Sequence, residues 1–397
     1  MASPVLTAEI SAVTSERGTS DYNVCVYHSG LREPLGRFIE KIWPNDRAAD
    51  SGKVPGLGSK GGKQDAPIFL FMKGQEVIGH IATLPVRLYS QSGVHPAHWV
   101  VGFMVLPEYR NGIIGPLLIK KINETLDFAL TLHVEEAPLR IFRGLGWKYG
   151  GIIPQYVLPI KPYSFLRNLN LAGLSFVQRK DKSPVALLSR LLSWPLTRSV
   201  SCFALAGALR LLSSAASLRR PALDSGTVRE ESEFDAAYDA LWQRVAHKYG
   251  VLVVRDRRYL QTRYGERNGL YRILAYRERG ELIAYCVMKV KQFSDDSRVG
   301  CMKVGTVVDC LFDPDKTGAL QSLFGAVIRL CAQETVDAVF CTASFPPLQR
   351  ILSLNGFIKT PGNLNFAYLD TKNNLPSHSS LDMWHLMRGD SDADANF

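Results

Sequence analysis

The sequence predicts a mixed α/β protein that contains two copies of one unit, each a mainly antiparallel sheet flanked by helices. Three observations support this fold class. The chain has 397 residues, which is more than one hydrophobic core usually serves. Two series of apolar segments follow each other in the same order. Within each series the apolar spacing changes from the period of a strand to that of a helix.

Three pairs of landmark residues define the repeat. The pairs are Gly74 and Gly280, Pro107 and Pro314, and Gly146 and Gly356, which lie 206, 207 and 210 positions apart. Chance rarely keeps three landmarks in one order at nearly one offset. We therefore interpret the two series as copies of one fold.

Each copy is expected to hold a strand, a second strand, a helix, a third strand and a short helix. The predicted strands and long helices are 76–88, 116–128 and 129–132 in the first copy, and 281–293, 320–335 and 338–342 in the second. The short helices should end at Gly146 and Gly356, because a left-handed glycine commonly closes a helix.

The predicted domain boundaries follow from the repeat. They are 1–165 for the first copy, 166–227 for a linker, 228–375 for the second copy and 376–397 for a tail. Within the linker, residues 184–221 contain five arginines and no acidic residue. This segment is either a pair of helices packed on the domains, or an amphipathic segment that rests on an anionic membrane surface. Its uncharged runs are too short to span a bilayer.

Composition narrows the class of protein. The chain is 46% hydrophobic and 21% charged, which is typical of a globular protein, and its net charge is +10. That charge fits an anionic partner or simply a solvated basic surface. The seven cysteines form no CxxC pair, so we expect buried free thiols, a cytoplasmic location and no metal site. The N-terminal residues show no secretory signal.

Residues 106–118 read LPEYRNGIIGPLL, which predicts a strand end, a glycine-containing turn and a helix start. Backbone N–H groups in such a turn and at a helix N-terminus bind phosphate. Together with the later helix that ends in Gly146 and a tryptophan, this stretch resembles the GNAT superfamily of acyl-CoA N-acyltransferases. The family's turn has Arg or Gln, two residues, Gly, one residue, then Gly or Ala. Arg110 and Gly115 match its first and last positions, whereas Ile113 replaces the first glycine and Pro116 removes one N–H group.

The resemblance covers residues 22–160 and 234–369 and implies a site. Acetyl-CoA or another acyl-CoA would lie between the strand that ends at Val105 and the strand 129–132. The implied cofactor-binding residues are Met104, Val105, Arg110, Asn111, Gly112, Ile113, Ile114 and Gly115. The second copy has neither the arginine nor the glycine pair. It has Asp313 and Asp315 instead, so we expect it to shape the acceptor site rather than bind CoA.

The catalytic residues are less clear from the sequence. Many family members carry a proton-donating tyrosine where this chain has Phe142, and the second copy has Leu352 there. N-acylation also needs a base. The candidates are His133, Glu135 and Asp309. His133 and Glu135 also fit a helix start, and Asp309 also fits a buried hydrogen bond within an apolar strand.

These patterns lead to one expected function and two alternatives. We expect a cytoplasmic N-acyltransferase that acts on an amine. Under the second interpretation of 184–221, it is peripheral to the inner face of the membrane. The amine would belong to an amino sugar or to a cell-envelope or polysaccharide precursor, and an arginine-rich stretch, residues 255–274, could bind an anionic acceptor. The tail resembles the end of tandem GNAT-like proteins linked to surface polysaccharide synthesis. The alternatives are a non-catalytic acyl-CoA sensor and an aminoacyl transferase acting on a peptidoglycan precursor. No nucleic-acid partner is expected.

Overall fold

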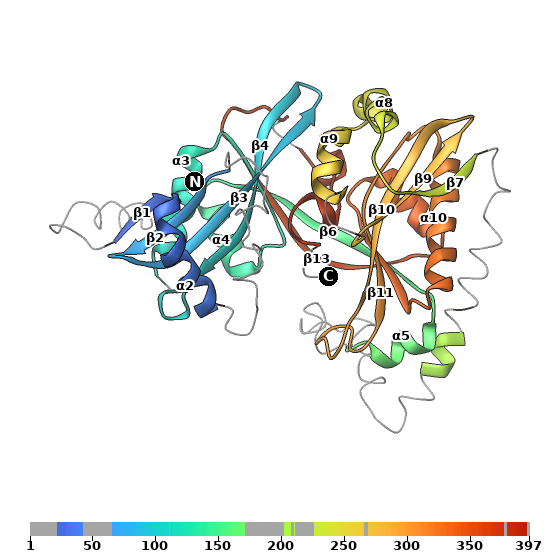
Figure 1. Ribbon diagram of the computed structural model, residues 1–397, viewed down its shortest axis with the longest axis horizontal. Helices are drawn as coiled ribbons and strands as arrows, with labels where there is room; N and C mark the ends of the chain where they lie inside the picture. Colours follow the sequence, from blue (N-terminus) through green and yellow to red (C-terminus); the bar gives the residue numbers. More distant parts are fainter. Residues whose placement is uncertain are drawn as a thin grey trace. The chain divides into compact units, whose positions relative to one another are not determined.

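The computed structural model describes residues 22–42, 66–110, 112–170, 202–207, 210, 226–265, 269–376 and 379–394. These residues form two compact units. Unit 1 contains the described residues up to Ile152 with Leu364–Ser380 and Ser391–Ala393, and unit 2 contains those of Ile153–Asn363, Leu381–Asp390 and Asp394. Each unit therefore takes segments from both halves of the chain, as the colours of Figure 1 show.

Unit 1 has a sheet in the strand order β1-β2-β3-β4-β5-β13. Its elements are β1 (Tyr22–Val26), α2 (Arg32–Ile42), β2 (Ile68–Lys73), β3 (Glu76–Ser90), β4 (Gly93–Val105), the short helix η3 (Pro107–Tyr109), α3 (Ile114–Thr125), β5 (Phe128–Leu132), α4 (Glu136–Gly144), the start of β6 (Lys148–Pro159) and the end of β13 (Ile358–Asp370). Neighbouring strands are antiparallel except β4 and β5, which are parallel.

The two faces of this sheet carry different helices. A Cβ at Gly79 in β3 would lie 2.8 Å from Ile114 of α3. The next residue, His80, stacks its ring on Phe38 of α2. Because successive side chains of a strand point to opposite faces, α2 and α3 cover opposite sides of the sheet. Helix α4 packs beside α3.

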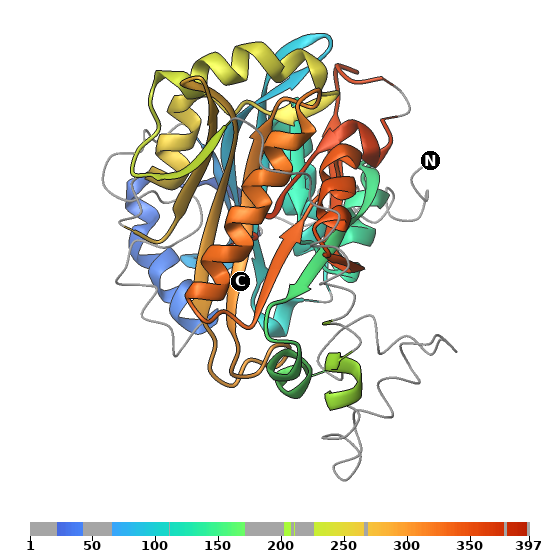
Figure 2. The same ribbon diagram turned by 90° about the vertical axis from the view of Figure 1, so that its right-hand side faces the viewer.

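Unit 2 has a sheet in the strand order β6-β12-β11-β10-β9-β7. Its elements are the end of β6, α5 (Pro162–Asn168), β7 (Thr227–Glu231), α8 (Ala236–Val245), β8 (Val251–Val253), α9 (Arg257–Leu260), β9 (Arg272–Glu278), β10 (Glu281–Gln292), β11 (Lys303–Phe312), α10 (Thr317–Gln333), β12 (Ala338–Thr342), α11 (Pro346–Leu354), the start of β13, β14 (Trp384–His385) and the short helix η8 (Arg388–Asp390). Only β11 and β12 are parallel within this sheet order. Helix α10 lies along the sheet, which it contacts at β9, β10 and β11 (Figure 2).

The last strand of each series pairs with the other series. Strand β6 follows the first series along the chain, yet its second half pairs with β12, where Pro159 lies opposite Ala338. Strand β13 follows the second series, and its second half pairs with β5, where Phe366 lies opposite Leu132. Each sheet is thus completed by a strand that is distant in sequence.

The predicted elements agree closely with the observed ones. The strands expected at 76–88 and 281–293 are β3 and β10, which start where predicted and differ by one or two residues at their ends. The helices expected at 116–128 and 320–335 are α3 and α10, each of which starts and ends two or three residues earlier than predicted. The predicted glycine caps are confirmed, because Gly146 and Gly356 have φ of 93° and 87°. In both caps the following N–H closes the helix, as Trp147 N donates to Phe142 O at 3.1 Å.

Most of the predicted linker segment 184–221 lies outside the described residues. Residues 202–207 are helical, and Cys202 and Ala206 pack against Leu166 of α5. The side chain of Phe203 is 67% exposed, and its ring lies 4.7 Å from that of Tyr163. One face of this short helix is therefore buried in protein, as the first interpretation of the linker requires. The domain boundaries and the membrane contact stay predictions.

Candidate functional site

The two parallel strands of unit 1 separate at their carboxyl ends. Strand β4 pairs with β5 at only three positions, the last being Val100 with Thr131. Beyond Val100, β4 continues to Val105 but pairs only with β3. The strands therefore diverge where the sequence predicted that acyl-CoA would lie, and we call this divergence of β4 from β5 the splay. Met104 and Val105 are half-buried on the diverging part of β4.

The turn after β4 leads directly into α3. Gly112 and Ile113 are exposed, whereas Ile114 and Gly115 are buried. Ile113 occupies the N-cap position, and its side chain makes no capping hydrogen bond. The first N–H groups of an α-helix have no partner within the helix and carry partial positive charge. This end of α3 can therefore attract an anion, with Pro116 removing one donor. Asn111 lies outside the described residues.

Gly115 is closely packed, so that even a Cβ there would require the Phe103 ring to move slightly. A Cβ built there would lie 3.1 Å from Phe103 Cζ and 3.5 Å from Ile141 Cδ1. Phe103 comes from β4 and Ile141 from α4, so the glycine lets three elements meet beneath the turn. We expected the glycine to admit a phosphate, and the structure adds a packing reason for it.

Arg110 closes the end of β4. Its exposed side chain donates from Nε to the carbonyl oxygen of Val105 at 3.1 Å. Val105 is one of the two β4 residues, with Met104, that the family resemblance implies for acyl-CoA binding. The guanidinium therefore lies beside that predicted contact, with further N–H groups available to an anion.

Phe142 is buried among aromatic rings. It meets Phe103 edge-on at 6.1 Å and Trp147 at 4.6 Å. Asn123 of α3 accepts a hydrogen bond of 2.8 Å from the Trp147 indole. At the position of the family's proton-donating tyrosine, this chain thus has an apolar side chain that fixes α4 against the sheet.

His133 and Glu135 lie between β5 and α4, and both are exposed. His133 has φ of 66°, a left-handed conformation that is uncommon for a residue with a side chain and often marks a functional position. Glu135 is the N-cap residue of α4, where its negative charge interacts favourably with the helix dipole. Its position agrees with a helix start although its side chain makes no capping hydrogen bond, and the catalytic role of Glu135 stays a prediction.

Two further polar residues lie near this end of β5. Asn365 of β13 donates to the carbonyl oxygen of Val134 at 2.8 Å, and Tyr149 donates to Asn365 Oδ1 at 3.1 Å. Tyr149 lies two residues after Trp147 of the Gly-Trp pair, so its position along the chain is a local signal. Asn365 carried no local signal, since it reaches unit 1 through the pairing of β13 with β5.

Several solved structures have a similar fold, including the following three. A GCN5-related N-acetyltransferase from Anabaena variabilis is 12% identical, with a TM-score of 0.55 over 88% of this chain and 73% of its own. A probable N-acyltransferase from Enterococcus faecalis is 9% identical, with a TM-score of 0.55 over 89% and 74%. Saccharomyces cerevisiae N-myristoyltransferase with bound myristoyl-CoA is 14% identical, with a TM-score of 0.51 over 89% and 84%.

The chain has the GNAT fold. Identities this low establish the architecture alone, and no protein-family model or curated protein matches the sequence. The mixed α/β fold class expected from the sequence is confirmed.

The equivalent splay in unit 2 is filled by the chain itself. Strands β11 and β12 pair only from Val304 with Ala338 to Val307 with Cys341. Beyond this point residues 384–390 lie against both strands, and we call them the closing segment. Ser344 N donates to Leu386 O at 3.1 Å on the β12 side, and His385 Nε2 hydrogen-bonds Cys310 O at 2.8 Å on the β11 side.

Asp309 is part of this filling. It is 1% exposed and accepts a hydrogen bond of 2.8 Å from Arg255 Nε, while Arg255 Nη2 donates to Asp390 Oδ1 of the closing segment at 2.8 Å. Tyr264 also donates to Asp309 at 3.2 Å. Burial raises the pKa of Asp390 to about 6, although Arg255 favours its charged form. This geometry favours the structural interpretation of Asp309 over a catalytic one.

The arginine-rich stretch divides into buried and exposed members. Arg255 is fully buried and pairs with Asp309, whereas the side chain of Arg263 is 14% exposed and pairs with Asp394. Arg272 pairs with Glu230 and Glu334 on unit 2. These three guanidinium groups form ion pairs within the protein. Binding of an anionic acceptor would therefore depend on exposed neighbours such as Arg257 and Arg258.

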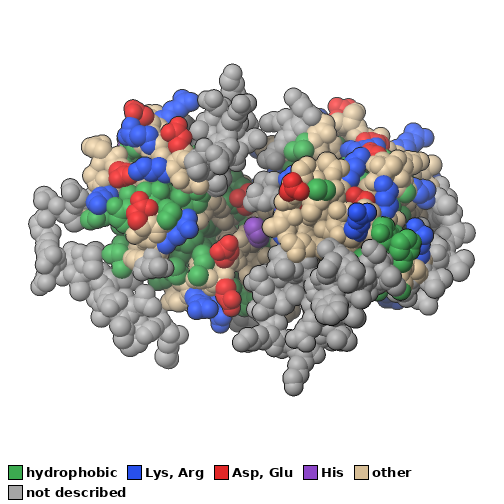
Figure 3. All heavy atoms as spheres, turned by 90° about the horizontal axis from the view of Figure 1, so that it is seen from below, with side chains coloured by type: hydrophobic (Ala, Val, Ile, Leu, Met, Phe, Trp, Pro, Cys, Tyr) green, Lys and Arg blue, Asp and Glu red, His purple; other side chains and the backbone are tan. Residues whose placement is uncertain are grey.

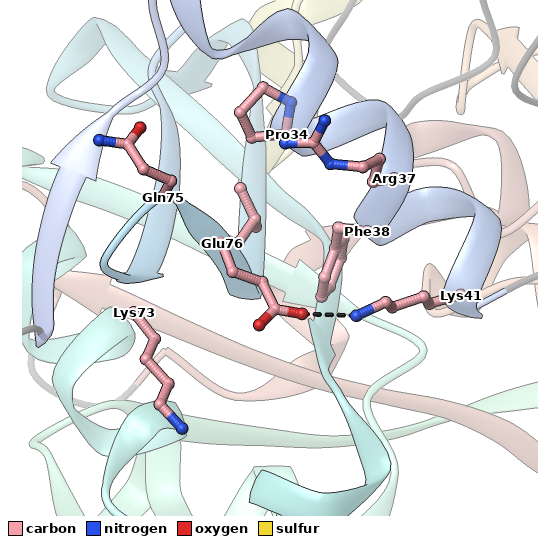
Figure 4. A pocket seen from close by; sticks show the side chains of 8 residues that line it. Pro34, Arg37, Phe38, Lys41, Lys73, Gln75 and Glu76 are labelled. Carbon is pink, nitrogen blue, oxygen red and sulfur yellow. Dashed lines mark hydrogen bonds and ion pairs between the residues drawn. The ribbon is translucent and has the colours of Figure 1, made fainter.

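A pocket of about 290 Å³ lies on the α2 face of unit 1 (Figure 4). It is lined by Pro34, Arg37, Phe38, Lys41, Lys73, Gln75, Glu76 and Val77. Lys41 and Glu76 form an ion pair of 2.5 Å across it. Lys73 is turned to Tyr109 of η3, whose hydroxyl it contacts at 3.0 Å. None of the predicted site residues lines this pocket, which lies on the side of the sheet opposite α3.

Charged side chains show no single concentrated patch on the visible described surface in Figure 3, where basic and acidic groups alternate. Within the part of the chain that the structure describes, no helix is long and apolar enough to cross a membrane. No group of three or more His, Cys, Asp or Glu side chains among the same residues could hold a metal ion.

Proposed function

We propose that this protein is an N-acyltransferase that transfers an acyl group from acyl-CoA to an amine. The acyl group that we favour is acetyl. The proposal rests on one observation: β4 and β5 diverge directly beside the N-terminus of α3 in unit 1. We further propose that the chain is a tandem of two GNAT-like copies, of which only the first binds acyl-CoA.

The splay supplies the contacts that a thioester substrate of this kind needs. Backbone groups of Met104 and Val105 would pair with the amides of the pantetheine arm, because this stretch has no β5 partner. The N-terminus of α3 would hold the pyrophosphate through its free N–H groups and dipole. Arg110 would add a positive charge at the same end.

The chemistry requires one proton to leave the acceptor ammonium before the amine attacks the thioester carbonyl. The C–N bond then forms, the attacking nitrogen gives up its second proton to solvent, and the C–S bond breaks, releasing the CoA thiolate, which takes up a proton in turn. His133 is the candidate base that we favour, because it is exposed at the carboxyl end of β5. Glu135 is disfavoured by its N-cap position and Asp309 by its burial. Phe142 cannot protonate the thiolate, so this proton would come from Tyr149 or water.

The closing segment supports assigning CoA to the first copy alone. It occupies in unit 2 the place that the splay leaves open in unit 1. In addition, Asp313 and Asp315 follow β11 where the turn of the first copy has Arg110, and Lys248 pairs with both at 2.5 and 2.6 Å. A pyrophosphate there would be repelled by two carboxylates, and the lysine beside them already forms ion pairs with both.

Calorimetric titration with acetyl-CoA and longer acyl-CoAs tests the proposal. We expect binding by the wild-type chain and at least a tenfold loss in Gly115→Leu, whose side chain would push Phe103 and the helix start apart. Gly36→Ala in α2 is the matched glycine control, because a Cβ there meets nothing within 4 Å. Absence of wild-type binding would reject the proposal, and unchanged affinity in Gly115→Leu would move the site elsewhere.

A non-catalytic acyl-CoA sensor is the second candidate. The buried, apolar Phe142 at the position of the usual acid favours it. Acyl-CoA binding without release of CoA across a panel of amino sugars and other amines would support the sensor over the enzyme. Transfer from an aminoacyl donor, in a chain that binds no CoA, would point to the aminoacyl transferase instead.

For the acceptor and the location we propose an amino sugar or cell-envelope precursor, handled in the cytoplasm near the membrane. The support is the basic segment 184–221 and the exposed Phe203 beside Tyr163. Sedimentation of the full chain with anionic and with neutral vesicles tests the membrane contact. Equal recovery from both, or an unchanged result in Phe203→Ser, would contradict it.

A further inference from the structure

Strand β4 contains a bulge at the point where it leaves β5. In its pairing with β3, His80 lies opposite Met104 and Ala82 lies opposite Val101. Ile81 alone therefore faces two residues of β4, Gly102 and Phe103. Gly102 has φ of 59°, the left-handed conformation that a glycine-containing bulge requires. Such a bulge bends its strand and changes where the following side chains point.

His80 holds the backbone of this bulge. Its Nδ1 lies 2.7 Å from the carbonyl oxygen of Gly102. A carbonyl oxygen can only accept, so Nδ1 carries the hydrogen and Nε2 carries none. Nε2 is buried and has no hydrogen-bond partner among the residues that the structure describes, and the ring stacks on Phe38 with the ring centres 6.2 Å apart. The neutral ring thus donates its only N–H group to the carbonyl oxygen of Gly102.

The bulge in turn determines what lies beneath the phosphate-binding turn. It directs Phe103 toward the α3 face, where its Cζ lies 3.1 Å from a Cβ built at Gly115. The same ring packs edge-on against Phe142 of α4. Pairing between β4 and β5 ends at Val100, two residues before Gly102. The position of this one carbonyl therefore affects both the opening of the splay and the seat of α3.

We propose that His80 is a positioning residue of the acyl-CoA site: by holding the Gly102 carbonyl it fixes the bulge that separates β4 from β5. The role rests on the proposed function, since it concerns the geometry of that site. His80 acts from the α2 face, on the opposite side of the sheet from the turn. It reaches the site only through the backbone of β4 and does not touch the substrate.

Hydrogen exchange of the unliganded protein tests the structural half of the proposal. In His80→Leu, which removes the donor and keeps bulk, amides of residues 101–105 should exchange at least about fivefold faster, with little change in 86–97. His80→Asn places an amide N–H near the position of Nδ1 and should restore slow exchange. Phe38→Leu loosens the same contact without removing the hydrogen bond and should resemble wild type. Equal exchange in His80→Leu and wild type, or equal acceleration in Phe38→Leu, would overturn the role of the hydrogen bond.

Affinity for acetyl-CoA tests the functional half with the same three variants. His80→Leu should weaken binding about tenfold, His80→Asn should recover most of it, and Phe38→Leu should bind like wild type even where it melts earlier. Normal wild-type binding with unaffected His80→Leu would reject the positioning role alone. Absence of binding by wild type would reject the proposed function and the positioning role with it, while the exchange result would still decide whether His80 fixes the bulge.

Discussion

At the scale of single residues, the buried side chain of His80 makes a hydrogen bond that water cannot replace. Among the described residues its ring has one hydrogen-bond partner, Gly102, and it has no exposure to water. Burial lowers the pKa of His80 to about 4, although the hydrogen bond to Gly102 opposes the shift. Adding a proton would place a charged N–H group against Phe38 with no acceptor. The imidazole is therefore neutral in the folded chain at pH 7.

The stability of the chain should depend on this histidine below neutral pH. The unfolded chain takes up a proton near pH 6.5, whereas the folded chain does so only near pH 4. Between these values the unfolded state binds more protons, so the free energy of unfolding falls as the pH falls, by about 2 kcal/mol between pH 7 and 4.5. Denaturant unfolding of wild type and His80→Asn at both pH values measures this. The variant should lose less stability, and an equal loss would contradict the assignment. His385 is present in both proteins and cancels.

At the scale of whole elements, helix α3 packs against β3 closely enough to exclude a methyl group. A Cβ at Gly79 would lie 2.8 Å from Ile114 Cγ2 and 3.1 Å from Phe71 Cβ, a contact that cannot move freely. Gly305 occupies a similar place in β11 under α10. There a Cβ would meet the Sγ atom of Cys331 at 3.0 Å and then only atoms beyond 3.5 Å.

These two glycines allow a matched comparison. Gly79→Ala should reduce the free energy of unfolding by about 1 to 3 kcal/mol, because overpacking forces the helix away from the strand. Gly305→Ala should cost less, since a single sulfur can rotate away. Denaturant titration of both variants checks the order. A larger loss in Gly305→Ala would show that α10 is held more rigidly than α3.

The elements that sequence reasoning located share one property: their signal is local. Strand β3 and helix α10 have regular apolar periods, and the caps at Gly146 and Gly356 need only a glycine after a helix. The contributions of Asn365 and of the closing segment have no such signal. Both depend on pairing between segments that are far apart in the sequence, which no local period encodes. His80 was missed for a related reason, because a single histidine within an apolar strand looks like core until its partner is known.

For unit 2 as a whole, one buried arginine joins three distant segments. Arg255 follows β8, Asp309 lies in β11 and Asp390 belongs to the closing segment, 54 and 135 residues away from the arginine. All three side chains are at most 1% exposed. Removing the cation would leave two carboxylates close together without water.

Arg255→Met should therefore destabilise the protein strongly, by about 3 to 5 kcal/mol, which is typical when one partner of a buried ion pair is removed. Arg257→Met, an exposed arginine two residues later, is the control and should change stability little. Thermal unfolding at neutral pH measures both. Adding Asp309→Asn and Asp390→Asn to Arg255→Met should recover part of the loss. No recovery would mean that packing, and not unpaired charge, is responsible.

For the whole chain, two similar sheet edges raise the question of how many acyl-CoA molecules bind. The splay of unit 1 is bordered by the α3 turn, whereas that of unit 2 contains the closing segment. There His385 hydrogen-bonds the carbonyl oxygen of Cys310, and a Cβ built at Gly389 would lie 2.7 Å from the carbonyl oxygen of Val308. Calorimetry should accordingly give one acyl-CoA per chain, and Gly115→Leu should abolish the whole signal. A stoichiometry of two, or half of the heat surviving in Gly115→Leu, would require the closing segment to leave unit 2. Because Arg255 fastens that segment through Asp390, Arg255→Met is the variant in which a second site would first become measurable.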